Sequence, residues 1–119
     1  MNVQEIMSSP VVVTRKGTQL KHTRELFARK GVHAIPVLRE DGEIEGIISS
    51  GDVAKTHSDE TRVEEIMTDM VHVVVKNNRV QDAAKIMLKH NVHHLVVMDD
   101  GDVIGMISSL DIIAALIKD

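Results

Sequence analysis

The sequence contains no cysteine, no tryptophan and no tyrosine, and Phe27 is its only aromatic residue. Without cysteine there is no disulfide framework and no thiolate metal site. Without aromatic rings the chain lacks the stacking platform that single-strand nucleic-acid binders use. A formal net charge of −4 also gives no basic footprint, so nucleic acid is not an expected partner.

Long apolar runs are missing as well. The longest, Ile112–Ile117, is too short to cross a bilayer, and the opening "MNVQEIM" has no apolar region of the signal-peptide kind. We therefore expect a cytoplasmic protein without a membrane partner. Hydrophobic residues make up 43% of the 119 positions, which is enough for an aliphatic core in one compact domain.

The chain repeats itself. "VQEIM" from Val3 returns as "VEEIM" from Val63, "GVHAIPVL" from Gly31 as "NVHHLVVM" from Asn91, and "GIISSGD" from Gly46 as "GMISSLD" from Gly105. This self-similarity indicates two tandem units, which we place at residues 1–59 and 60–119. Either unit alone would bury too little surface to be stable, so we expect the two to pack together.

Both units predict the same elements: a short helix, then the order β-α-β-β-α. β-branched runs predict a first strand in each unit, and apolar residues at helical spacing predict the helix that follows. Thr18 and Asn78 are the expected N-caps of these helices. Asp-Gly turns then join two strands. The expected strands are Val11–Thr14, Ile35–Arg39 and Ile44–Ser49 in the first unit, and Val71–Val75, Leu95–Asp99 and Val103–Ser108 in the second.

A final helix should follow the last strand of each unit, and the polar segment Thr56–Arg62 should link the units. Strands mixed with helices in this order indicate an α+β fold with α/β-like character, in which helices and sheets pack in layers.

The repeated phrase closes with Ser49-x-x-Asp52 and Ser108-x-x-Asp111, where a strand meets a helix. One interpretation is purely structural: the serine caps the helix, and the aspartate lies in its first turn. The functional interpretation uses the same geometry. A helix N-terminus binds phosphate, and a nearby carboxylate can accept both hydroxyls of a ribose. The spacing alone leaves both interpretations open.

Taken together, these motifs resemble a pair of cystathionine-β-synthase (CBS) domains, the tandem arrangement called a Bateman module, over essentially the whole chain. The resemblance rests on "IM" after the short helix, "VHAIPV", D-G-x-x-x-G-x-I-S and S-x-x-D, in both copies. It implies two units packed sheet to sheet around a pseudo-twofold axis, with two clefts. It also implies a homodimer and a stand-alone regulatory module, not an enzyme, whose effector protein is unknown.

The ligand implied by the resemblance is an adenosine nucleotide. AMP is the first expectation and ADP or ATP the next, with Mg²⁺ able to accompany ATP; no resident cofactor is expected. An S-adenosylmethionine sensor, or an interaction module with unoccupied clefts, are the alternatives.

The resemblance also implies which residues bind. Asp52 and Asp111 would bind ribose hydroxyls, and Ser49 and Ser108 would approach the phosphate. The adenine pocket and the apolar walls would come from residues of both units: Met106, Val12, Val32 and His33 for the Asp111 cleft, and Ile47, His72, Val92 and His93 for the Asp52 cleft.

Family members that bind phosphate strongly often carry His-Arg where this chain has His33-Ala34 and His93-His94. Because Ala34 carries no charge, we expect His94 to assist phosphate binding and the Asp111 cleft to bind AMP more tightly. The histidines also raise the possibility of a metal, since imidazole suits zinc, copper and nickel. However, His93 and His94 should point to opposite faces of a strand, so no metal site is expected.

Catalysis would require a nucleophile and a base in one cleft. Ser108 and Asp111 provide a hydroxyl and an acid, with His93 or His94 as the candidate base. Helix capping and ribose binding already account for the spacing of the serine and the aspartate, so we do not expect an enzyme.

Overall fold

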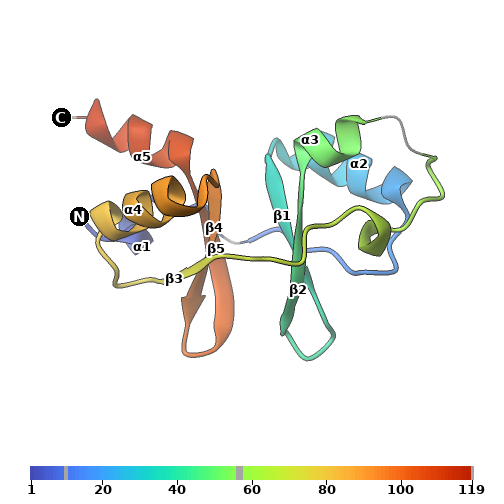
Figure 1. The fold of residues 1–119 in the computed structure, drawn as a ribbon, viewed down its shortest axis with the longest axis horizontal. Helices are drawn as coiled ribbons and strands as arrows, with labels where there is room; N and C mark the ends of the chain where they lie inside the picture. The colour runs from blue at the N-terminus through green and yellow to red at the C-terminus, as the bar shows by residue number, and fades with distance from the viewer. Residues whose placement is uncertain (10, 56–57, 119) are drawn as a thin grey trace. The chain divides into compact units, whose positions relative to one another are not determined.

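The computed structural model describes residues 1–9, 11–55 and 58–118, and Figure 1 shows its helices and strands. The chain forms two compact units. The Asp111 unit consists of Met1–Val11 and His72–Asp119, and the Asp52 unit consists of Val12–Val71. Thr56 and His57 of the expected linker lie outside the described residues. Both units combine helices with a sheet, which confirms the α+β class.

The Asp111 unit contains α1 (Val3–Ile6), β3 (Val73–Val75), α4 (Val80–His90), β4 (His94–Asp99), β5 (Asp102–Ser108) and α5 (Ser109–Leu116). Its sheet has the strand order β3-β4-β5; β3 runs parallel to β4, and β4 antiparallel to β5. The aliphatic core draws on α1, on all three strands and on α4, through Val3, Val74, Ala83, Met87, Leu95, Val97 and Ile107.

The Asp52 unit contains α2 (Leu20–Lys30), β1 (Ala34–Leu38), β2 (Ile44–Ser49), α3 (Ser50–Ala54) and the 3₁₀ turn η1 (Val63–Glu65). Its two strands pair antiparallel. The core repeats the pattern of the other unit, with the single phenylalanine in the place of Met87. It consists of Leu20, Phe27, Ile35, Val37, Ile48, Val53 and Val63.

The compact units divide the chain differently from the sequence repeats. Helix α1 belongs to the first repeat, yet its Val3 lies in the core formed with β3, α4 and β5. Likewise, η1 belongs to the second repeat, and its Val63 lies in the core of the Asp52 unit. Each repeat therefore supplies the short helical segment that completes the core of the other.

A close backbone approach fixes each of these segments. After α1, Ser8 exchanges two backbone hydrogen bonds with Met106 of β5, at 2.8 and 3.1 Å. After η1, Thr68 exchanges two with Ile47 of β2, both at 2.9 Å. A Cβ at Gly105 would lie 2.8 Å from the carbonyl oxygen of Ser8, and one at Gly46 the same distance from that of Thr68. Glycine at these two positions allows the segments to pair with the strands.

The first strand expected in the Asp52 unit does not form. Val11–Thr14 provides only an isolated parallel bridge between Thr14 and Val37, whereas Val73–Val75 forms β3. The reason is Pro36. In the Asp111 unit the N–H of Val96 donates to the carbonyl oxygen of His72 at 3.0 Å. Pro36 occupies the equivalent position in β1 and has no N–H to donate, so the ladder cannot continue along β1.

The N-caps of the two long helices also differ from expectation by one residue. They are Gln19 and Arg79 rather than Thr18 and Asn78. Asn78 is engaged elsewhere, because its Oδ1 accepts the N–H of Val75 at 2.9 Å and so closes the turn after β3. The C-terminal ends follow the sequence signal, since Gly31 and Asn91 both take the left-handed conformation.

We expect Gly105→Ala to destabilise the protein by about 1–3 kcal/mol, the usual cost of overpacking, because the backbone of Ser8 cannot move aside. Urea unfolding measures the effect. Gly51→Ala is the matched control: a Cβ there meets only Ser49 Oγ at 3.7 Å, so helix propensity should leave stability equal or higher. Equal losses in both variants would contradict the steric explanation.

Candidate ligand-binding site

The two S-x-x-D motifs form capping boxes. Ser108 ends β5, and its Oγ accepts the N–H of Asp111 at 3.1 Å, while Asp111 Oδ2 accepts the N–H of Ser108 at 2.8 Å. Ser49 and Asp52 repeat the arrangement at 3.2 and 2.9 Å. The structural interpretation of the motif is therefore confirmed for both copies, and each carboxylate is held in one orientation by the cap.

The caps leave half of each carboxylate unused. Asp52 and Asp111 are both partly exposed, and their Oδ1 atoms accept no hydrogen bond from the described part of the chain. An ionised carboxylate oxygen accepts more than one hydrogen bond. Each aspartate can therefore hold its helix with one oxygen and accept hydroxyl groups from a ligand with the other.

The helix N-termini have fewer unpaired N–H groups for binding an anion than the sequence suggests. In α5 the N–H of Ser109 donates to the carbonyl oxygen of His93 at 2.9 Å, and the N–H of Asp111 is bonded to Ser108. In α3 the N–H of Ser50 donates to the carbonyl oxygen of His33 at 2.9 Å. These first-turn donors are already satisfied within the protein, which leaves fewer for a phosphate.

The remaining predicted residues fall into two groups. Met106 is buried, at 9% exposure, and Ile47 is half-buried. Each directly follows the glycine that allows the segment after α1 or after η1 to pair with the strand. His94 begins β4 opposite Ser108. The wall residues predicted for the Asp111 cleft belong to the Asp52 unit: Val12, Val32 and His33. Those predicted for the Asp52 cleft belong to the Asp111 unit: His72, Val92 and His93. Their part in binding stays a prediction.

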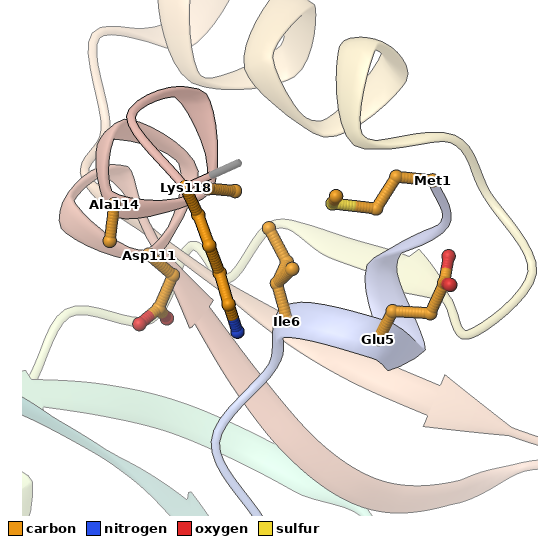
Figure 2. A pocket seen from close by; sticks show the side chains of 7 residues that line it. Met1, Glu5, Ile6, Asp111, Ala114 and Lys118 are labelled. Carbon is orange, nitrogen blue, oxygen red and sulfur yellow. The ribbon is translucent and has the colours of Figure 1, made fainter.

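A pocket adjoins Asp111 that the sequence did not reveal. It has a volume of about 570 Å³ and lies between α1 and α5, lined by Met1, Glu5, Ile6, Asp111, Ala114, Ala115 and Lys118. Figure 2 shows these side chains around it. The contributions of α5 follow helical spacing and could have been recognised. Those of α1 could not, because the packing of α1 against α5 depends on the exchange of segments between repeats.

Two histidines lie close together, one before β3 and one at the end of α4. The rings of His72 and His90 stack with centroids 4.1 Å apart and an angle of 21° between their planes. Loss of hydration lowers the pKa of His90, and the neighbouring charges of His72 and Lys89 lower it further. Within residues 1–9, 11–55 and 58–118, no three histidine or acidic side chains gather where they could hold a metal ion.

The structure repeats one arrangement in a tandem α+β architecture: an aspartate capped at Oδ2 whose Oδ1 has no partner among the described residues. The family of CBS domains matches residues 3–59 and 63–118, and the chain belongs to this family. It is a CBS domain pair, a regulatory ligand-binding module. None of the helices in the described part of the chain has the length and apolar composition needed to cross a membrane.

Similar structures include two that were solved with bound ligands. The CBS domain pair of protein MJ0100, in complex with 5′-methylthioadenosine and S-adenosyl-L-methionine, is 28% identical with a TM-score of 0.89, and the match covers 98% of this chain and 95% of that one. CBSX2 in complex with AMP is 25% identical with a TM-score of 0.81, and the match covers 97% and 95% of the two chains.

Similar sequences differ in length. Protein MJ1426 of Methanocaldococcus jannaschii is 30% identical, and the match covers 98% of this chain and 92% of that protein. A homoserine O-acetyltransferase of Methanosarcina acetivorans is also 30% identical, but the match covers 94% of this chain and only 21% of the enzyme. The chain therefore corresponds to a small part of that enzyme.

The stacked histidines predict how stability depends on pH. Because the pKa of His90 is lowered by folding, the unfolded chain binds the proton first as pH falls below about 6.5. The free energy of unfolding then decreases until folded His90 is also protonated. We expect His90→Gln to reduce the stability lost between about pH 7.5 and about pH 5.5, as measured by urea unfolding. His33→Gln, at an exposed histidine outside the stack, is the control; identical pH profiles for wild type and His90→Gln would contradict this linkage.

Proposed function

We propose that this CBS domain pair senses an adenosine-containing ligand, with AMP as the first candidate and ADP or ATP next. The observation that carries the proposal is that the two carboxylate oxygens of Asp52, and likewise those of Asp111, have different roles. In each, Oδ2 is anchored by the backbone N–H of the capping serine, and Oδ1 remains without a partner among the described residues. A carboxylate fixed in this way is oriented to accept the two hydroxyls of a ribose.

S-adenosylmethionine is the second candidate, supported by the ligands of the MJ0100 pair. AMP, 5′-methylthioadenosine and S-adenosylmethionine all carry the same ribose diol, so an aspartate that binds the diol does not select among them. Selection must come from groups that face the rest of the ligand. A thermal-shift panel of these compounds, with ATP tested with and without Mg²⁺, ranks them because a bound ligand raises the melting temperature.

The aspartates can be tested without disturbing the caps. In Asp111→Asn the amide oxygen can still accept the N–H of Ser108, but the negative charge that strengthens hydrogen bonds from ribose is lost. We expect AMP affinity at the tighter site to fall by about tenfold or more, whereas Asp52→Asn should leave that binding event unchanged. Isothermal titration calorimetry measures both.

Asp102→Asn, on the exposed end of β5, is the control for general charge effects. If Asp52→Asn removed the tighter event and Asp111→Asn left it intact, the predicted ranking of the two sites would be reversed. If neither variant changed AMP binding, the proposed role of the carboxylates would fail.

We also propose that the protein forms a homodimer through an apolar face of α4 and α5. The exposed fractions of Leu88, Leu116 and Ile117 are 84%, 79% and 82%, and Leu110 and Ile113 on α5 are exposed as well. The equivalent positions of α2 and α3 carry Ala28, Gly51 and Ala54 in place of Leu88, Leu110 and Ile113. Burial of such a face against a second copy would stabilise a closed twofold dimer.

The dimer is tested by the double variant Leu88→Glu and Leu116→Glu. Two carboxylates per subunit at an apolar interface should prevent association, and light scattering at micromolar concentration should then give the monomer mass. Ala28→Glu, at the position of α2 equivalent to Leu88, should leave the dimer intact. A monomeric wild type, or a double variant that stays dimeric, would refute the proposed interface.

A further inference from the structure

The pocket beside Asp111 is built on one stripe of α5. Asp111, Ala114 and Ala115 follow the spacing i, i+3 and i+4, which places them along one side of α5. Lys118 lies just beyond the last helical residue, Leu116. The two alanines leave room between the carboxylate of Asp111 and Lys118. Met1 and Ile6 line the opposite side together with Glu5, whose Oε2 accepts the N–H of Asn2. In Figure 2 the Lys118 side chain extends into the space between Asp111 and Ile6.

Lys118 is a cation whose charge is not neutralised within the described chain. Among the described lysines, two form ion pairs: Lys16 with Glu45 at 3.1 Å and Lys76 with Asp99 at 3.0 Å. Lys118 makes neither an ion pair nor a hydrogen bond with any described residue. Its ammonium group has three donors, so it is free to bind an anionic group that enters the pocket.

An anion at this site needs such a cation. Two first-turn N–H groups of α5 are already bonded, that of Ser109 to His93 and that of Asp111 to Ser108. The helix terminus alone therefore provides few donors. A lysine within the same pocket provides a charge-assisted hydrogen bond, which is about twice as strong as a neutral one.

The Asp52 unit shows the opposite arrangement at the equivalent positions. The offset of 59 that relates Asp111 to Asp52 places Lys55 where α5 has Ala114, and Asp59 in place of Lys118. Asp59 is also occupied, since the guanidinium of Arg24 binds its carboxylate. Helix α3 ends at Ala54, so Lys55 and Asp59 both follow the helix. The reversed charge at Asp59 suits an anionic ligand less well.

We propose that Lys118 binds the anionic group of a ligand whose ribose is held by Asp111, and that it makes the Asp111 site selective for charged over neutral adenosine compounds. The proposal rests on the function proposed above. The anionic group is the phosphate of AMP or the carboxylate of S-adenosylmethionine, and the two share the chemistry that an ammonium group recognises. Adenosine, which has the ribose and no anionic group, is the neutral reference.

Calorimetry on Lys118→Ala with AMP, S-adenosylmethionine and adenosine tests the proposal. We expect the affinity for AMP, for S-adenosylmethionine or for both to fall by about tenfold, and the affinity for adenosine to change by less than about twofold. A loss confined to AMP identifies phosphate as the bound group, and a loss confined to S-adenosylmethionine identifies the carboxylate. Lys118→Arg should retain the affinity, because it retains the charge.

Lys85→Ala, on the exposed side of α4 and outside the pocket, controls for a general change in charge. An equal loss for adenosine, AMP and S-adenosylmethionine, no loss for any of them, or the same loss in Lys85→Ala would overturn the role of Lys118. A wild-type protein that binds none of the three compounds would instead overturn the proposed function itself.

Discussion

The structure depends on one close approach in each unit. There, the segment that follows α1 or η1, which we call the crossing segment, pairs with a strand beside a glycine. Ser8 pairs with Met106 beside Gly105, and Thr68 pairs with Ile47 beside Gly46. A Cβ at either glycine would collide with a backbone carbonyl oxygen, so both pairings require glycine. Through them each repeat completes the core of the other, which gives a physical reason why two small repeats are stable in one chain although either alone would bury too little surface.

The same approach positions the candidate site. Met106 bonds to Ser8 two residues before Ser108, so the crossing segment lies next to the point where β5 ends and α5 begins. Helix α1, which precedes that segment, then forms one wall of the pocket whose other wall is α5. Asp111 therefore faces a surface assembled from both repeats, and an unpaired repeat could not provide it.

Local signals in the sequence predicted most elements and the two S-x-x-D caps. Asp-Gly turns and the S-x-x-D spacing act over a few residues, so their consequences could be read directly, and both capping boxes formed as expected. The N-cap predicted at Asn78 failed for a local reason, because Asn78 closes the turn after β3. Two other misses have longer-range causes. The first strand of the Asp52 unit failed because Pro36, in a different segment, lacks the N–H that the pairing needs. Similarly, the pocket at Asp111 depends on where α1 packs, and no local pattern of residues encodes that.

Because duplication copies helix caps as well as binding sites, a cap alone is weak evidence for a ligand site. A difference between the two copies around the capped aspartate is stronger evidence. Both copies retain the cap, because a helix that begins at the end of a strand needs its N-terminal N–H groups satisfied. The cap consumes only one oxygen of each aspartate, so stability and ligand binding do not compete for the same atom. The surroundings of the two carboxylates were then free to change. Lys118 stands in one copy where Asp59 stands in the other, and the proposed selectivity of the Asp111 site rests on this difference in charge.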